Sequence, residues 1–345
     1  MAPEEPPEQT HNATPTCPIF INNISIRSTI THPSLIHHIQ STLPTVSTQT
    51  QSPNRQHHSI TPSSSLLLMP SWSLSPSLPY IGVKVVTTYP ENSTRNLPGI
   101  HASYILFDSI TGRTLAVVDG TELTLWRTSC VCALGAKFLA REDSEVLLVV
   151  GAGALAPHMV RAHLSVLPRL KRVVVWNRTV EKARDLVRKL KEEMGSVGDG
   201  GNGVWFECGE CLEEIVGVAD VITCATNSRS ALVKGEALKG GAHVGLVGSF
   251  TPAMRECDDE TVRRGRVFVD CEDAMVEAGE LVGAFERGVL RADEIGGTLV
   301  DLIKGEKIGR RGPEEITVFK SVGSAVVDIV SAQLVYESFL HTSNL

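Results

Sequence analysis

The stretch "EVLLVVGAGALA" at residues 145–156 constrains the fold more than any other part of the sequence. An apolar run of strand type enters a glycine turn with the pattern G-x-G-x-x-A, and a helical pattern leaves the turn. In such a unit Gly151 permits the tight turn, Gly153 lets the backbone approach a pyrophosphate, and Ala156 keeps the helix close to the sheet. Free N–H groups at the start of the helix attract phosphates. The sequence therefore predicts a Rossmann-type dinucleotide site.

The end of the next apolar run, "RVVVW" at 172–176, predicts which dinucleotide is bound. NAD-binding chains usually place Asp or Glu there to accept from the ribose 2′-hydroxyl, and that carboxylate would repel a 2′-phosphate. This chain has Asn177, Arg178 and Thr179 instead. A guanidinium beside amide and hydroxyl groups suits a phosphate, so we expect NADPH, with NADH as the alternative. A solvated surface arginine without a ligand is the other interpretation of Arg178.

The pattern of the chain changes near residue 145. Short strand-like runs separated by Pro, Gly and Asp turns precede this point, and strands that alternate with helical patterns follow it. Parallel strands need helical crossovers, so we predict an α/β fold with a doubly wound Rossmann sheet plus an α+β domain built from both chain ends. The predicted boundaries are 18–130 with 316–345 for the α+β domain, 131–315 for the Rossmann domain, and 1–17 for a disordered tail.

Composition narrows the classes of partner. The net charge is −7 and no basic cluster is longer than two residues, which argues against a nucleic-acid partner. No apolar run approaches the roughly 20 residues of a membrane span, so we expect no membrane partner. The C-x-x-C at 208–211 lacks a second pair, and the acidic run at 256–260 is typical of a solvated, capped helix start. We therefore predict no metal site.

Four segments, in the same order, resemble the ornithine cyclodeaminase/mu-crystallin family. They are "VVGAGALAPHMVRAHL…VVVWNRT", "VDGTELTLWRTSCVCALGAKFLA", "GAHVGLVGSF" and "ITVFKSVGSAVVDIVSAQLVYES". Within the family, "SSSLLLMPSW" and "EAGELVGAFERGV" are similar to a plant branch, the ketimine reductases of pipecolate biosynthesis. The resemblance implies a homodimer in which both chain ends form the substrate-binding and dimerisation domain. It also implies a plastid location, whereas the acidic, Pro-rich start favours the cytosol.

The resemblance also implies site residues. Lys84 and Arg127 match the family's catalytic and substrate-binding cations, and Arg55 matches a further substrate-binding arginine. By pattern alone, Lys84 could equally protect the edge of a sheet, and Arg127 could be a surface arginine. The motifs and the resemblance together predict the following cofactor contacts: Gly151, Gly153, Ala154, Leu155, Ala156, Asn177, Arg178, Thr179, Ala225, Thr226, Val247, Gly248, Lys320 and Ser321.

One departure from the family pattern points to the reaction. The cyclodeaminase branch has a catalytic Asp after the fifth Rossmann strand, where this chain has Phe250. A phenyl ring cannot handle the proton chemistry of ammonia release, whereas hydride transfer does not need that Asp. We therefore expect NADPH-dependent reduction of the cyclic imino acid Δ1-piperideine-2-carboxylate to pipecolate, in lysine catabolism and plant defence. The alternatives are an ornithine cyclodeaminase, a non-catalytic NADPH-dependent binding protein of mu-crystallin type, and a reductase of the five-membered pyrroline ring.

Overall fold

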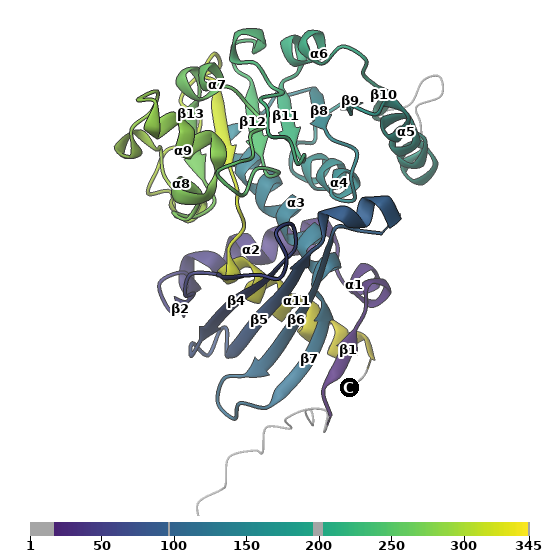
Figure 1. The fold of residues 1–345 in the computed structure, drawn as a ribbon, viewed down its shortest axis with the longest axis vertical. Coiled ribbons are helices and arrows are strands. Elements are labelled where there is room, and N and C mark those ends of the chain that lie inside the picture. Colours follow the sequence, from purple (N-terminus) through teal and green to yellow (C-terminus); the bar gives the residue numbers. More distant parts are fainter. Residues whose placement is uncertain (1–16, 96, 196–202, 344–345) are drawn as a thin grey trace, which may run out of the picture.

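The computed structural model describes residues 17–95, 97–195 and 203–343. Figure 1 shows two layered domains, one above the other, joined by a long helix and a strand-to-helix crossing near the C-terminus. The predicted tail at 1–17 lies outside the described residues except for Cys17. No helix of the described chain is long and apolar enough to cross a membrane.

The first domain contains a mixed sheet with the strand order β1-β7-β6-β5-β4-β2, and β3 pairs with β4. β1 pairs with β7 in parallel, and the other pairs are antiparallel. The strands are β1 Ile19–Ile21, β2 Thr50–Gln51, β3 Gln56–Ser59, β4 Ser65–Ser73, β5 Tyr80–Thr88, β6 Ile100–Asp108 and β7 Thr114–Asp119. The helices of this part are α1 Asn23–Thr29, α2 His32–Val46, the 3-10 helix Pro90–Arg95 and, from the far end of the chain, α11 Ala325–Ser343.

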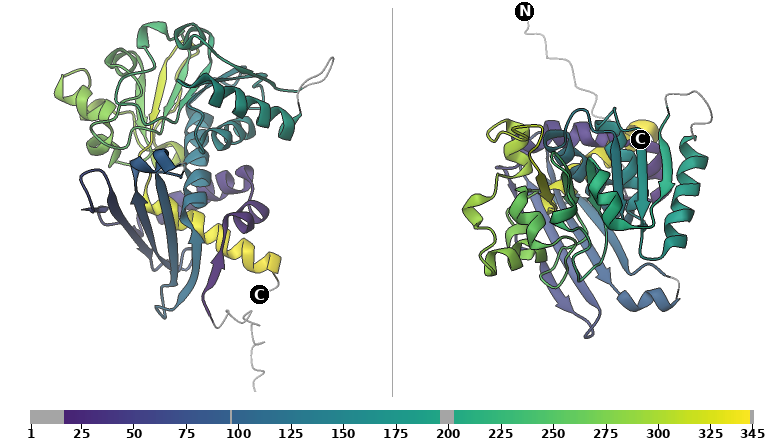
Figure 2. Two further views of the ribbon diagram at one scale, coloured as in Figure 1. Left: turned by 45° about the vertical axis from the view of Figure 1, so that its right-hand side comes forward. Right: turned by 90° about the horizontal axis from the view of Figure 1, so that it is seen from above.

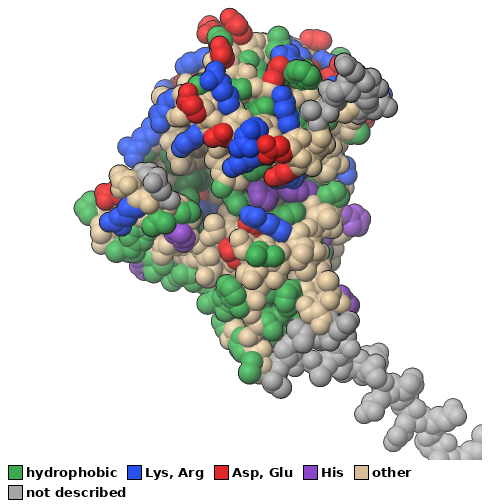
Figure 3. All heavy atoms as spheres, turned by 90° about the vertical axis from the view of Figure 1, so that its right-hand side faces the viewer, with side chains coloured by type: hydrophobic (Ala, Val, Ile, Leu, Met, Phe, Trp, Pro, Cys, Tyr) green, Lys and Arg blue, Asp and Glu red, His purple; other side chains and the backbone are tan. Residues whose placement is uncertain are grey.

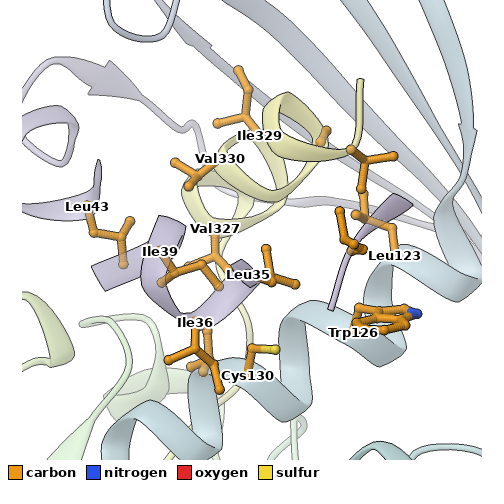
Figure 4. Packing of buried hydrophobic residues seen from close by; sticks show 14 of the residues in the cluster. Leu35, Ile36, Ile39, Leu43, Leu123, Trp126, Cys130, Val327, Ile329 and Val330 are labelled. Atoms are coloured by element: carbon orange, nitrogen blue, oxygen red, sulfur yellow. The ribbon is translucent and has the colours of Figure 1, made fainter. Parts of the chain in front are cut away.

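Helices cover one face of this sheet. α11 packs against β4, β5 and β6 as well as against α2, so both ends of the chain meet in one core. Figures 1 and 2 show α11 beside the N-terminal strands. In Figure 4, Leu35 and Ile39 of α2 lie close to Val327 of α11, and Leu123 and Trp126 of α3 lie nearby. Residues on the opposite face of β5, such as Val83 and Val85, are only half-buried.

The second domain contains seven parallel strands in the order β10-β9-β8-β11-β12-β14-β13, which confirms the predicted doubly wound sheet. The strands are β8 Val146–Val150, β9 Arg172–Trp176, β10 Trp205–Cys208, β11 Val221–Cys224, β12 His243–Leu246, β13 Arg266–Val269 and β14 Thr317–Lys320. Its helices are α4 Ala156–Val166, α5 Val180–Met194, α6 Leu212–Val218, α7 Asp259–Arg264, α8 Ala274–Glu277, α9 Gly279–Glu286 and α10 Leu299–Lys304, with 3-10 turns at Gly235–Ala237 and Ala292–Glu294.

One predicted boundary is wrong. The strand near 316–320 was assigned to the α+β domain, but β14 lies between β12 and β13 in the Rossmann sheet. The run "ITVFK" is apolar and β-branched, and pairing on both sides buries all four residues of β14. The chain therefore enters the first domain only after Lys320.

The long helix α3, Gly120–Leu139, connects the domains, and the predicted boundary at 130/131 falls inside it. Asp119 caps the helix by accepting a hydrogen bond from the backbone N–H of Glu122 at 2.9 Å. Most of α3 is buried, because it packs against α2, α4, β6, β12 and β14. Gly135 allows the closest approach, since a Cβ there would lie 2.7 Å from the ring of Phe319 on β14.

Candidate active site

Lys84 and Arg127, predicted from separate parts of the sequence, meet at one buried carboxylate. The Lys84 Nζ lies 2.7 Å from Oδ2 of Asp328, and the Arg127 Nε lies 3.0 Å from Oδ1 of the same side chain. The exposed fraction is 3% for Lys84 and 0% for Asp328. Because β5 is an interior strand and both cations are buried, Lys84 is not an edge-protecting lysine and Arg127 is not a surface arginine.

Asp328 was not identified from the sequence. It lies in the first turn of α11, in the run "SAVVDIVSAQLV", whose periodicity indicates only core packing. The one available signal was a carboxylate inside an otherwise apolar helix, since a buried charge needs a partner.

Burial and the neighbouring charges together set the pKa values of this cluster. Burial lowers the pKa of Lys84 to about 8, Asp328 opposes that change, and the charge of Arg127 adds to it. Burial alone would raise the pKa of Asp328, but Lys84 and Arg127 hold it below its usual range. With Lys84 protonated, two cations and one anion leave one positive charge, which suits a small carboxylate.

Arg55 lies on the β2–β3 connection, near the same cluster. Its Nη2 donates to the backbone oxygen of Gly323 at 3.0 Å, and its Nε lies 3.0 Å from Oε1 of Glu277 on α8. Gly323 also faces Arg127, because a Cβ at this left-handed position would lie 2.4 Å from the Arg127 Nη1. Gly323 therefore lies against both guanidinium groups, and this end of the loop needs glycine.

A second residue missed from the sequence, Asp270, fixes that loop. Its Oδ2 accepts hydrogen bonds from the Ser321 hydroxyl at 2.7 Å and from the Gly323 N–H at 2.8 Å. The Ser321 N–H donates to Leu246 at the end of β12. The loop thus joins the substrate-side cations to the carboxyl ends of the Rossmann strands, where dinucleotides bind in this type of sheet.

The glycine turn lies at those strand ends with the geometry that a pyrophosphate requires. Gly151 has a φ of +115°, and a Cβ there would lie 2.6 Å from the Ala225 carbonyl oxygen. A Cβ at Gly153 would have no neighbour within 4 Å, so the backbone of Gly153 is open to a ligand. A cleft of about 330 Å³ lies beside the turn, and the predicted cofactor residues that line it are Gly151, Gly153, Asn177, Arg178, Thr179, Ala225 and Thr226.

The remaining predicted contacts lie beside this cleft or away from it. Leu155 and Ala225 pack against Val247, and Ala156 is buried at the start of α4. Ala154 lines a neighbouring cleft of about 1100 Å³, whose lining does not include Lys84 or Arg127. In Figure 3 histidine side chains mark the boundary between the domains on this side of the molecule.

Glu256 joins Gly248 to Thr226, and the prediction that Glu256 is solvated was wrong. Glu256, expected on a solvated helix start, is fully buried and accepts from the N–H groups of Thr226 at 2.7 Å and Gly248 at 2.8 Å. The prediction of a capped helix holds two residues later, where Asp258 accepts from the Thr261 N–H at 2.9 Å.

Two predicted cofactor contacts have their side chains engaged elsewhere. The Lys320 side chain is completely buried, and its Nζ lies 3.5 Å from Oε2 of the buried Glu280. The Ser321 hydroxyl is bonded to Asp270. Neither residue lines the cleft of about 330 Å³, so the structure does not bring the Lys320 amine or the Ser321 hydroxyl to the cofactor site.

Asn177, Arg178 and Thr179 follow the end of β9 and line the smaller cleft. The Asn177 Oδ1 accepts from the Ala152 N–H at 3.2 Å, and its Nδ2 donates to the Thr179 carbonyl at 2.8 Å. The Arg178 side chain is exposed and has no carboxylate partner among the described residues. These residues fit a phosphorylated ribose, and no carboxylate at the end of β9 repels one.

Comparison with known proteins identifies the family. The model of the ornithine cyclodeaminase/mu-crystallin family matches residues 19–343. The chain belongs to the ornithine cyclodeaminase/mu-crystallin family.

Individual relatives cover nearly the whole chain. It is 54% identical to Protein SAR DEFICIENT 4 of Arabidopsis thaliana over 94% of this chain and 98% of that protein. It is 36% identical to the Δ1-pyrroline-2-carboxylate reductase of Colwellia psychrerythraea over 83% of this chain and 89% of that protein. The structure of the Thermococcus litoralis Δ1-pyrroline-2-carboxylate reductase, in complex with NADH and L-proline, superposes with a TM-score of 0.87 at 29% identity, and the match covers 94% of this chain and 98% of that one.

Proposed function

We propose that the chain is an NADPH-dependent reductase of cyclic ketimine carboxylates that converts Δ1-piperideine-2-carboxylate to pipecolate. The observation that carries the proposal is the buried Lys84–Asp328–Arg127 cluster, which has one net positive charge and is linked to the carboxyl end of β12 through the loop at 321–323. Relatives in the same family that are named Δ1-pyrroline-2-carboxylate reductases support the reaction class, reduction of a C=N bond by a nicotinamide cofactor.

In the proposed mechanism each protein group has one task. Arg127, with Arg55, binds the substrate carboxylate, and charged hydrogen bonds of this kind contribute about 1.5–3 kcal/mol each. Lys84 donates a proton to the ring nitrogen and is left neutral, which its lowered pKa makes accessible near neutral pH. NADPH, when bound, would supply the hydride for C2, so that the C=N double bond becomes a C–N single bond with one new C–H and one new N–H bond. Gly151, Gly153 and Thr226 would hold the dinucleotide.

Cyclodeamination is disfavoured by the surroundings of Phe250. Its half-buried ring packs against the apolar core of the second domain, where the cyclodeaminase branch has an Asp. A phenyl group at this position neither accepts a proton nor orients water. A non-catalytic binding protein would have no need for a buried lysine poised for proton transfer, so we rank that alternative lower as well.

We also propose that two copies of the chain associate through the uncovered face of the first sheet. Leu68, Val83, Val85, Ile105 and Phe107 are neighbours on that face and are half-buried rather than buried. Figure 3 shows hydrophobic side chains gathered over the first domain and charged ones over the second. An apolar sheet face of this kind is typical of a dimer interface.

Location in a plastid rather than the cytosol stays a prediction, which a fluorescent fusion of the full chain would test.

The test of function follows NADPH absorbance with purified protein and Δ1-piperideine-2-carboxylate, and chiral chromatography identifies the product. We expect pipecolate to form at the rate of NADPH loss. Lys84→Ala and Arg127→Ala should each reduce kcat/KM by at least about 100-fold while NADPH still binds. Arg184→Ala, which removes an exposed arginine beside Glu210, is the control. Protein that binds NADPH but consumes none with either the six- or the five-membered imine would contradict the proposal, and proline formed from ornithine would favour the lyase.

A further inference from the structure

We propose that Asp328 is a positioning residue of the active site, whose carboxylate sets the placement of Lys84 and Arg127 and leaves the cluster a single positive charge for the substrate carboxylate. The proposal rests on the reductase function proposed above and names a residue that acts through two others rather than on the substrate.

Each carboxylate oxygen of Asp328 contacts a different cation. Oδ2 lies 2.7 Å from the Lys84 Nζ, and Oδ1 lies 3.0 Å from the Arg127 Nε, so one planar group determines the spacing of two cations. Two buried like charges at this spacing repel each other, and burial makes each of them more costly. A bridging carboxylate counters both effects. Without it, neither cation would be held at its present place.

Asp328 is itself held rigidly. It lies in the first turn of α11, where the helix dipole favours a negative charge, and its N–H donates to the Ser324 carbonyl at 3.1 Å. Its neighbours Val327 and Ile329 belong to the central core. A group on a packed helix fixes its partners more precisely than a group on a loop.

The charges around Lys84 come from several elements. α11 contributes Asp328, α3 contributes Arg127, and the β2–β3 connection contributes Arg55. Tyr104 of β6 lies directly across the sheet from Lys84 and is neutral, because burial raises its pKa and the charge of Asp328 raises it further. Asp328 therefore supplies the negative charge that keeps Lys84 protonated against burial and two arginines. Removal of that charge should make Lys84 lose its proton at lower pH.

The test compares pH profiles of the wild-type protein and Asp328→Asn, a change that keeps the shape and removes the charge. Two readouts are used: initial rates of ketimine reduction, and binding of pyrrole-2-carboxylate, a planar analogue that cannot be reduced, to protein loaded with NADP⁺. We expect the alkaline limb of both profiles to move to lower pH by at least about one unit. Glu337→Gln is the matched control, because this carboxylate on the same helix binds Tyr80 at 2.9 Å, away from the cluster; its limb should not move.

The outcomes separate this proposal from the function. A wild-type protein that reduces no ketimine overturns the proposed function, and the binding profile then still tests Asp328. An unmoved limb in Asp328→Asn overturns the positioning role. If Asp328→Asn does not fold, Asp328→Glu replaces it: the limb should stay within about half a unit, but kcat should fall at least tenfold because the cations are displaced. A kcat equal to that of the wild type would overturn the proposal.

Discussion

The proton on Lys84 is held less tightly than that of an ordinary lysine, because burial lowers its pKa to about 8. If this proton goes to the ring nitrogen, the active form of the enzyme is the protonated one. We expect kcat/KM to fall as the pH rises through about 8, where Lys84 becomes neutral. Lys84→Arg keeps the charge at higher pH, so its residual activity should not decline in that range. Initial rates between about pH 6 and 10 would decide, and a wild-type profile that is flat across that range would rule out Lys84 as the proton donor.

Arg178 should determine the preference between the two nicotinamide cofactors. Its exposed guanidinium has no carboxylate partner among the described residues, so a 2′-phosphate would gain a charged contact. Arg178→Ala should raise the KM for NADPH by roughly tenfold or more, since such contacts contribute about 1.5–3 kcal/mol, and should leave the KM for NADH nearly unchanged. Steady-state kinetics with both cofactors test this. An equal rise in KM for NADPH and NADH would mean that Arg178 does not recognise the 2′-phosphate.

Among the single residues of the site, the sequence predicted Lys84 and Arg127 but not Asp328, the carboxylate that joins them. Lys84 and Arg127 stand out because a charge interrupts a strand pattern or follows a motif of the family. Asp328 and Asp270 act through three-dimensional contacts with residues far away in the chain, and no local pattern encodes such contacts. Glu256 was misjudged for the same reason, because a run of acidic residues does not indicate which of them the fold buries.

Among the secondary-structure elements, α3 and β14 pack closely enough to give a sharp test. Ala is a better helix former than Gly by about 1 kcal/mol, but a Cβ at Gly135 would lie 2.7 Å from the Phe319 ring. We expect the clash with Phe319 to outweigh the gain in helix propensity. Gly135→Ala should therefore lower the free energy of unfolding by about 1–3 kcal/mol and the melting temperature by several degrees. Gly217→Ala in α6 is the control, because its Cβ would meet only an ordinary contact at 3.5 Å, so the same change should raise the melting temperature. Opposite signs in thermal melts would support this account; a stabilised Gly135→Ala would refute it.

The sequence predicted the type of most elements but not all of their neighbours. Strands at 146–150 and 172–176 follow from apolar runs and the glycine turn between them. The position of β14 between β12 and β13 could not be predicted in this way. An apolar β-branched run predicts a buried strand, but it does not indicate to which sheet the strand belongs.

For the whole molecule, the uncovered sheet face predicts the oligomeric state. A second copy packed on Val83 and its neighbours would give twice the chain mass of 37.2 kDa in light scattering. Val83→Lys places a charge in that interface and should give the single-chain mass. Ile308→Lys, at an exposed position of the second domain, is the control and should leave the mass unchanged. A single-chain mass for the wild-type protein would contradict the proposed dimer.

The late position of β14 and α11 in the chain has a consequence for synthesis. The Rossmann sheet lacks its penultimate strand until β14 has been made, and the first sheet lacks the helix that covers it until α11 follows. Lys84 and Arg127 leave the ribosome well before Asp328, so the two cations exist for a time without their shared counter-charge. The Rossmann sheet can therefore be completed before the first sheet is covered, and the Lys84–Asp328–Arg127 cluster forms only after α11 has been made.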